Sequence, residues 1–335
     1  MQMKKILVLF TGGTIGSVSD DGIIHVAGDG KFSLIKAYRE QFGCETQFEC
    51  RQILNILSEN IQLQHWERIA EILFNVDFSN YAGIIMTHGS DTLAYTSAFI
   101  GMYFRHIDIP LYIIASNKPL GEKGSNGLFN FAAAVEKIKE NKYSGIFTLY
   151  EKVYISTRLI PADTCRDRFQ AYGEDGCNEF SVFHGINESW LSQPRERFFT
   201  QKPELKKGVL KIDGYPGIDF SCYSIGNDTA AVLYNPYHSG TGCTDISAGE
   251  NYSLCKFIEK CLIRDIKVYI CGIKPGGAVY STLRDIIKAG CIPMYSISDV
   301  AAYMKLIIAY NQREYPVGEV LRRNLYFEIV GKSVK

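Results

Sequence analysis

The stretch that decides the fold is KILVLFTGGTIGS, residues 5–17. The consecutive apolar residues from Leu7 to Phe10 are typical of a strand buried on both faces, as in a parallel sheet covered by helices. The strand runs into Gly12 and Gly13, which permit a tight turn and let backbone N–H groups approach a ligand or an oxyanion. Thr11 and Thr14 flank the glycines and could place hydroxyl groups there. We therefore expect a ligand-binding loop at the carboxyl end of this strand, where open α/β sheets bind ligands.

Two other interpretations fit this loop. The threonines could cap backbone N–H groups in a purely structural strand-to-loop turn. A nucleotide site is the weaker alternative, because the stretch lacks both the GxGxxG spacing and the Gly-Lys-Ser/Thr ending of a phosphate-binding loop. The stretch by itself does not decide between a structural turn and a site.

Composition and charge exclude several classes of protein. The 335 residues are 46% hydrophobic and 21% charged, which is typical of a globular protein with room for two domains. Lys plus Arg and Asp plus Glu both number 36, so a small, roughly neutral substrate is favoured over nucleic acid or an anionic membrane. Six dispersed histidines and 10 scattered cysteines show no metal-ligand spacing. We expect a cytoplasmic protein with free thiols, no membrane span and no metal site.

Apolar strands alternate with amphipathic helices through the first half of the chain. The expected strands are 6–10, 83–86, 111–115, 145–150 and 152–155, and the expected helices are 61–74, 92–104 and 127–139. This alternation predicts right-handed βαβ crossovers, a mainly parallel sheet, and strand ends that open into one crevice.

The second half begins after a polar, proline-containing stretch that is typical of a linker. Beyond it, the expected strands are 209–212, 230–233 and 268–271, and the expected helices are 252–263, 281–289 and 298–310. The sequence therefore predicts an N-terminal α/β domain over 1–190, a linker over 191–207 and a smaller α/β domain over 208–335.

A second strand-end motif is IIMTHGSDT, residues 84–92. Here an apolar run again breaks at a glycine, and hydroxyl and carboxylate side chains follow. Ser90 or Asp91 could cap a helix that starts near Thr92, which is a structural role. His88 could act as a base, although a histidine at a strand end is more often a packed, hydrogen-bonded structural residue. If the two strands are neighbours, both loops face one crevice.

The two motifs together, TGGTIGS and THGSDTLAYT, resemble signatures of the bacterial L-asparaginase family, and the similarity is greatest to its cytoplasmic type I branch. Residues 58–60 resemble its substrate-carboxylate loop, 116–120 its Gly-Ser-Gln-x-Pro-Leu segment and 215–218 its Tyr-Pro-Gly-Ile. The resemblance implies the two-domain asparaginase fold, with a smaller flavodoxin-like or Rossmann-like second α/β domain. It also implies cofactor-independent conversion of L-asparagine to L-aspartate and ammonia, in a homodimer or homotetramer.

The resemblance also assigns roles to individual residues. Thr14 is the nucleophile that attacks the side-chain amide, releases ammonia and forms an ester that water then cleaves. Ser90 and Asp91 match residues that help to activate the water or nucleophile and hold the substrate's α-amino group. A threonine hydroxyl needs a nearby base to become nucleophilic, and the oxyanion needs backbone donors. The substrate-binding positions implied are Ser58, Glu59, Gly13 and Gly89.

Two family residues are missing from this chain. The family's mobile-loop tyrosine aligns with Ile23, which cannot transfer a proton. His25, two residues on, could supply an imidazole with a near-neutral pKa. The alternative, which we favour, is that His25 is an exposed loop residue.

The family's catalytic lysine is the second loss. Alignment on the flanking residues places Pro161 or Asp163 at its position, and neither replaces an amine. Arg158 could bring a cation to Asp91, but a guanidinium cannot shuttle protons. Lys118 is another cation on a strand-end loop, and we favour a surface role for it.

Loss of a general base typically costs on the order of 100-fold to 10,000-fold in rate. An attenuated or non-catalytic amino-acid-binding relative, or an amidase with an altered substrate, is therefore the alternative to an active asparaginase.

Overall fold

The computed structural model of the chain describes residues 4–13, 15, 17–20, 23–26, 30–43, 46–163, 167–173, 191, 193–276 and 278–331. The chain divides into two compact units. The N-terminal unit comprises Met1–Pro203 with Leu325–Phe327, and the C-terminal unit comprises Glu204–Asn324 with Glu328–Lys335. The division falls inside the stretch 191–207 that the sequence assigns to a linker.

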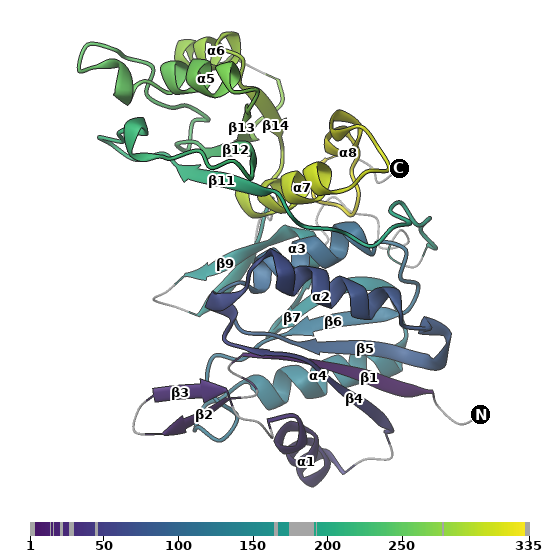
Figure 1. Cartoon of the computed structure of the whole chain (residues 1–335). Helices are drawn as coiled ribbons and strands as arrows, with labels where there is room; N and C mark the ends of the chain where they lie inside the picture. Colours follow the sequence, from purple (N-terminus) through teal and green to yellow (C-terminus); the bar gives the residue numbers. More distant parts are fainter. Residues whose placement is uncertain are drawn as a thin grey trace. The chain divides into compact units, whose positions relative to one another are not determined.

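A six-stranded sheet forms the centre of the N-terminal unit (Figure 1). Its strands, in spatial order, are β4 (Phe48–Ile56), β1 (Lys5–Gly12), β5 (Tyr81–Thr87), β6 (Pro110–Ile114), β7 (Gly145–Tyr150) and β8 (Lys152–Ile155). All neighbours are parallel except β7 and β8, which form an antiparallel hairpin. The apolar run of β1 is at most 2% exposed, as expected for a strand covered on both faces. The mainly parallel sheet that the alternation predicts is confirmed.

Helices cover both faces of this sheet (Figure 1). The helices are α1 (Gly30–Phe42), α2 (Leu63–Phe74), α3 (Leu93–Tyr103) and α4 (Gly127–Glu140). Helices α1 and α4 contact each other, and α4 packs on β5, β6 and β7. Helices α2 and α3 contact each other and pack on β4 and β7, respectively. Two small antiparallel pairs complete the unit, β2 (Ser17–Asp20) with β3 (Ile23–Val26) and β9 (Leu159–Asp163) with β10 (Arg168–Ala171).

The C-terminal unit contains a four-stranded parallel sheet. Its strands, in spatial order, are β11 (Gly208–Asp213), β12 (Thr229–Asn235), β13 (Lys267–Ile273) and β14 (Ile292–Tyr295). The helices are α5 (Leu254–Ile263), α6 (Ser281–Lys288), α7 (Asp299–Asn311) and α8 (Val317–Arg322). Helices α5 and α6 bury their apolar side chains against strands β12 and β13 in one core cluster, whereas α7 contacts β11, β12 and β13 and carries α8.

Every helix and strand that the sequence analysis expected is present, to within a few residues at each end. Several elements were not anticipated: α1, β4, β9, β10, β14 and α8, together with the β2 and β3 hairpin. The strand β4 is the important omission, because it covers the free edge of β1 and leads into the loop at Ser58.

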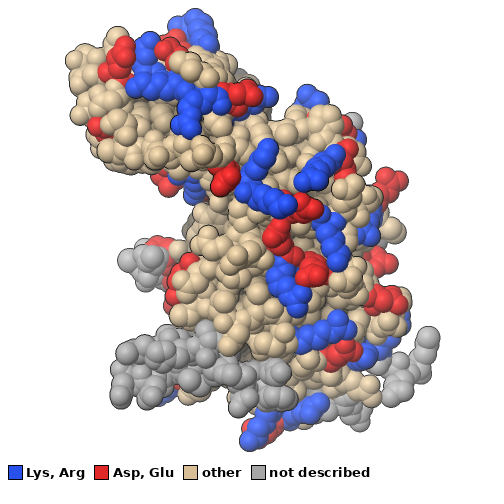
Figure 2. Space-filling model, viewed as in Figure 1, with Lys and Arg blue, Asp and Glu red and all other residues tan. Residues whose placement is uncertain are grey.

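Charged side chains of both signs share the surface. Figure 2 shows acidic and basic side chains interspersed on the face in view, in keeping with the formal net charge of +0. Among the residues that the structure describes, no helix has the length and apolar character needed to cross a membrane. In the same residues, no cluster of three or more His, Cys, Asp or Glu could hold a metal ion.

Candidate active site

The two glycine motifs lie at the ends of neighbouring strands. Strands β1 and β5 are adjacent and parallel, with Phe10 opposite Thr87. Their carboxyl ends therefore lie at the same edge of the sheet. The hydroxyl of Thr11 donates to the Thr87 carbonyl at 2.7 Å. This bond joins the two strand ends directly.

Gly13 and Gly89 bring the two loops into backbone contact. Gly13 has φ +74°, and a Cβ there would lie 2.4 Å from the Gly89 nitrogen. Only glycine permits that approach, because both the backbone conformation and the available space exclude a side chain. The N–H of Gly13 donates to the Ile56 carbonyl at 2.9 Å, at the end of β4. This particular amide is therefore used within the protein, rather than directed at a ligand.

A third loop completes the convergence. Ser58 begins the short 3₁₀ helix Ser58–Asn60 and is 5% exposed. A Cβ on Gly89 would lie 2.4 Å from the Ser58 hydroxyl oxygen, so the serine side chain packs directly on the second glycine motif. The structure therefore brings together Gly13, Gly89 and Ser58, three of the substrate-binding positions expected from the sequence.

Thr92 is a residue of this site that the sequence analysis did not identify as functional. It occupies the N-cap of α3, where neither Ser90 nor Asp91 acts as the cap and where the cap side chain makes no bond to the helix. Its hydroxyl instead donates to the Ser58 carbonyl at 2.9 Å. The capping role expected of Ser90 or Asp91 is wrong, because the N-cap position falls at Thr92. Thr92 fixes the Ser58 loop beside the second motif.

The loop after β6 adjoins the same region. The N–H of His88 donates to the Ile114 carbonyl at 2.8 Å, which aligns the end of β5 with that of β6. A Cβ on Gly127, at the start of α4, would lie 2.9 Å from both the Ile15 side chain and the Ser116 hydroxyl. Ile15 is 1% exposed, so the first motif is anchored on both sides of position 14.

His88 is a structural residue. It is 1% exposed, and its Nδ1 donates to the Gly89 carbonyl at 2.8 Å. Burial lowers its pKa to about 4, although the hydrogen bond to Gly89 opposes this shift. The imidazole is therefore neutral near pH 7 and holds the second glycine motif in shape, in agreement with the structural role that the sequence analysis favoured.

Asp91 lies at the open side of the site. Ser90 is half-buried, whereas Asp91 is exposed. Partial burial of its carboxyl group raises the pKa of Asp91, and the negative charge of Glu59 raises it further. No lysine or arginine in the described part of the chain lowers the pKa of Asp91. This carboxyl therefore has an acidic neighbour where the resemblance implied an ammonium partner.

The remaining candidates from the sequence are Thr14, His25, Lys118 and Arg158. Thr14 lies outside the described residues. His25 lies in β3, opposite Val18 of β2, and its side chain is outside the described part of the structure. Lys118 is exposed, as favoured. Arg158 is 4% exposed, and its Nε donates to the Phe327 carbonyl at 2.7 Å.

Arg158 belongs to a set of contacts that hold the segment Leu325–Phe327 within the N-terminal unit. The Tyr326 carbonyl accepts a hydrogen bond from the Thr157 hydroxyl, and the Tyr326 hydroxyl accepts one from the Ile146 N–H at 2.7 Å. The Arg195 guanidinium stacks over the Tyr326 ring at 5.0 Å. Arg158 therefore anchors this segment, which explains why an arginine occupies this position.

Comparison with known proteins identifies the class. Residues 5–168 match the protein-family model described as asparaginase, N-terminal. The chain is 26% identical over 351 residues to an L-asparaginase of Thermococcus kodakarensis, covering 98% of this chain and 99% of that protein. It is 23% identical over 349 residues to one subunit of the glutamyl-tRNA(Gln) amidotransferase of Methanococcus maripaludis, covering 98% of this chain and 81% of that protein.

Solved structures show the same fold. The thermostable L-asparaginase from Thermococcus kodakarensis superimposes with a TM-score of 0.74 at 25% identity, covering 98% of this chain and 100% of that one. L-asparaginase I from Vibrio cholerae superimposes with a TM-score of 0.76 at 20% identity and the same coverage. Fold and site therefore define the class: an α/β protein of two units, with three loops that converge at one edge of a parallel sheet. Residues 5–168 carry the asparaginase family's N-terminal domain, and the whole chain has the fold of the L-asparaginase from Thermococcus kodakarensis.

Proposed function

We propose that the chain is an amidohydrolase of the L-asparaginase type, converting L-asparagine to L-aspartate and ammonia. The observation that carries the proposal is the convergence of the Gly13, Gly89 and Ser58 loops at the carboxyl edge of the sheet. The first of these loops carries Thr14 in the sequence, between Gly13 and Ile15. The Thr14 oxygen attacks the side-chain amide carbon and the C–N bond breaks. The proton of the hydroxyl passes to the departing nitrogen, which leaves as ammonia. Water then cleaves the ester, which releases aspartate and restores the hydroxyl.

The neighbouring residues have distinct roles in this proposal. Ser90 and the Asp91 carboxylate activate the water or nucleophile and hold the substrate's α-amino group. Ser58 binds the α-carboxylate, with Glu59 beside it on the same 3₁₀ helix. Backbone N–H groups of the glycine motifs stabilise the oxyanion, other than the N–H of Gly13, which is bonded to Ile56.

The direct test is ammonia release by the purified chain at high enzyme concentration. L-Asparagine is the main substrate, and L-glutamine is the comparator because part of a glutamyl-tRNA(Gln) amidotransferase is among the relatives. We expect saturable ammonia release together with stoichiometric aspartate. If neither amide yields ammonia while isothermal titration detects asparagine or aspartate binding, the proposal of an active asparaginase is wrong.

A second candidate function is a non-catalytic or attenuated amino-acid-binding protein. The specific observation in its favour is the environment of Asp91, where Glu59 supplies negative charge and no described cation lowers the pKa. The substitution of Ile23 for the family tyrosine points the same way. An amidase with an altered leaving group is the related alternative, and a panel of amide substrates distinguishes it from the binding protein.

The pH profile of kcat/KM reports on Asp91 if the reaction needs its ionised form. Because the pKa of Asp91 is raised, activity should fall with decreasing pH through a pKa above the ordinary aspartate value of about 3.9. Glu59→Gln removes the negative charge, lowers the pKa of Asp91, and should move this acid limb to lower pH. Glu122→Gln, on the loop after β6, is the control and should leave the limb in place. If the acid limb does not move in Glu59→Gln, it does not report the ionisation of Asp91.

Assembly and location stay predictions. We infer a homodimer or homotetramer that binds a small amino-acid substrate in the cytoplasm, on the basis of the family resemblance. Light scattering on the purified chain measures the oligomeric state directly.

A further inference from the structure

The C-terminal unit contains a cavity of about 680 Å³ that the proposed reaction does not use. A cavity of this volume lies in the range of small-molecule sites, roughly 300 to 1,000 Å³. Its lining residues all belong to the C-terminal unit, whereas the glycine motifs belong to the N-terminal unit. None of the residues assigned to the asparaginase-type site is among the described lining residues.

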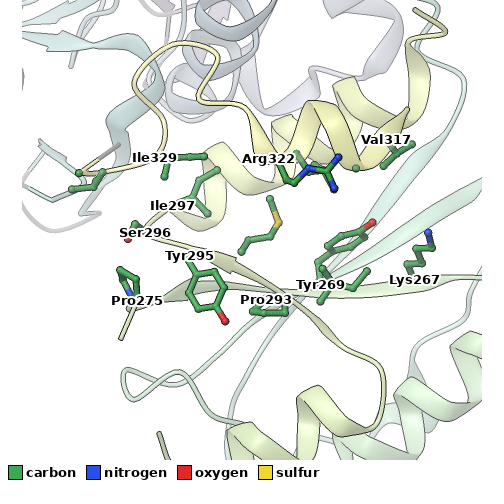
Figure 3. Close-up of a pocket in the computed structure, with 16 residues that line it drawn as sticks. Lys267, Tyr269, Pro275, Pro293, Tyr295, Ser296, Ile297, Val317, Arg322 and Ile329 are labelled. Atoms are coloured by element: carbon green, nitrogen blue, oxygen red, sulfur yellow. The ribbon is translucent and has the colours of Figure 1, made fainter. Parts of the chain in front are cut away.

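Secondary structure forms the walls of this cavity (Figure 3). Strands β13 and β14 provide one wall, with Tyr269 and Met294 among its side chains, and helix α8 provides the opposite wall, with Leu321. The end near Ser296 is closed by a hydrogen bond from the Val330 N–H to the Ser296 carbonyl, at 2.9 Å. Because these elements are hydrogen-bonded and packed, the cavity is part of the fold.

The lining is apolar and aromatic over most of its surface. Its apolar and aromatic members are Tyr269, Pro275, Ile292, Pro293, Met294, Tyr295, Ile297, Val317, Leu321, Ile329 and Val330. The Tyr269 hydroxyl is hydrogen-bonded to the Tyr310 hydroxyl at 2.9 Å, which fixes the Tyr269 ring in the wall. The Tyr269 ring is 2% exposed, and Figure 3 shows the Tyr295 ring on the side of β14 that faces away from α8, so the surface that a ligand meets is mainly aliphatic.

The charged residues of the lining carry one sign. Lys267 and Arg322 line the cavity, and no Asp or Glu is among the described lining residues. Figure 3 shows Arg322 on α8 facing Tyr269 on the opposite wall, with Lys267 on the same strand as Tyr269. Two cations near one end of an otherwise apolar cavity are complementary to a ligand that has an acidic group at one end.

The free edge of β14 does not favour an added peptide strand as the occupant. The strand has four residues, and Pro293 within it has no N–H to donate. Main-chain hydrogen bonds are the source of affinity in strand addition, so this edge is poorly suited to it.

We propose that this cavity binds an organic anion, a molecule with an apolar body and one acidic group. The apolar body occupies the space between Met294 on β14 and Leu321 on α8. The acidic group lies at the end where Lys267 and Arg322 approach.

The test uses 8-anilinonaphthalene-1-sulfonate, an aromatic sulfonate whose fluorescence rises on transfer from water to an apolar site. Titration of the full-length protein should give saturable binding to one site per chain. Arg322→Gln and Lys267→Gln should each raise Kd about tenfold, the scale of one charge-assisted hydrogen bond. Lys288→Gln, an exposed lysine of α6 that does not line the cavity, is the matched control and should leave Kd unchanged.

A second probe separates charge from apolarity. N-phenyl-1-naphthylamine has a similar ring system without the sulfonate, so it should bind more weakly to the wild type and respond little to either substitution. Val317→Trp should abolish binding of both probes by filling the cavity. Equal affinity for the neutral and anionic probes, or an unchanged Kd in the Arg322→Gln and Lys267→Gln double variant, would overturn the proposal. Thermal unfolding of each variant shows that an altered Kd is not caused by misfolding.

Discussion

Replacing Thr14 with alanine should lower ammonia release from L-asparagine by at least about 10⁴-fold, while the thermal unfolding midpoint stays unchanged. The expected loss is large because a nucleophile forms the covalent intermediate and no other group can substitute for it. Its sequence neighbours are fixed independently. Gly13 donates to the Ile56 carbonyl, and the buried Ile15 side chain lies against Gly127, so loss of the Thr14 hydroxyl leaves these contacts in place.

Two companion variants make this result specific. Thr14→Ser keeps a hydroxyl at the same position and should retain measurable turnover. Thr11→Val removes the other hydroxyl of the motif, which donates to the Thr87 carbonyl. It should lower the free energy of unfolding by about 1 kcal/mol yet keep Thr14-dependent activity. If Thr14→Ala keeps activity within tenfold of the wild type, Thr14 is not the nucleophile.

The sequence predicted those parts of the fold that depend on local pattern. The continuous apolar runs of β1 and β5 are at most 2% exposed from Ile6 to Phe10 and fully buried from Ile84 to Met86. Such runs indicate a strand covered on both faces. Strand β4, with the sequence FECRQILNI, was missed because it is an edge strand with polar and apolar residues mixed along it. Its position beside β1 depends on a pairing that no local pattern encodes.

The candidate site was predictable to the level of its loops, but its connections were not. The glycine motifs and Ser58 could be located by motif and spacing. The bond from the Thr92 hydroxyl to the Ser58 carbonyl spans 34 residues, and the bond from Arg158 to the Phe327 carbonyl spans 169. Such partners are set by tertiary packing. From the sequence, Ser90 or Asp91 looks like the cap of the following helix, although Thr92 occupies that position. An arginine near the missing lysine looks like its substitute, although Arg158 serves as an anchor.

One further buried residue had a visible signal in the sequence. Lys305 is a single charged residue within the apolar stretch 300–310 of helix α7. A lysine at that point must either reach solvent or find a buried acidic partner. The partner, Glu328, lies 23 residues later, beyond α8, and no periodicity connects the two positions. The helix was therefore predictable, while the ion pair that it buries was not.

Replacing Lys305 with methionine should lower the free energy of unfolding by about 3 to 5 kcal/mol. Its ammonium lies 2.6 Å from the Glu328 carboxylate, both side chains are 0% exposed, and the ammonium also donates to the Arg323 carbonyl. Removing the cation leaves a carboxylate buried without its counter-charge. Urea unfolding followed by circular dichroism measures the change as an earlier transition.

The double variant Lys305→Met with Glu328→Met separates the pair from its parts. An apolar pair of similar volume carries no desolvation cost, so most of the lost stability should return. Lys256→Met, which breaks the exposed pair with Glu259 on α5, should leave the transition nearly unchanged because solvent screens that pair. If Lys305→Met unfolds at the same urea concentration as Lys256→Met, the buried pair does not stabilise the C-terminal unit. If the double variant is as unstable as the single one, the loss comes from packing around Lys305 rather than from an uncompensated charge at Glu328.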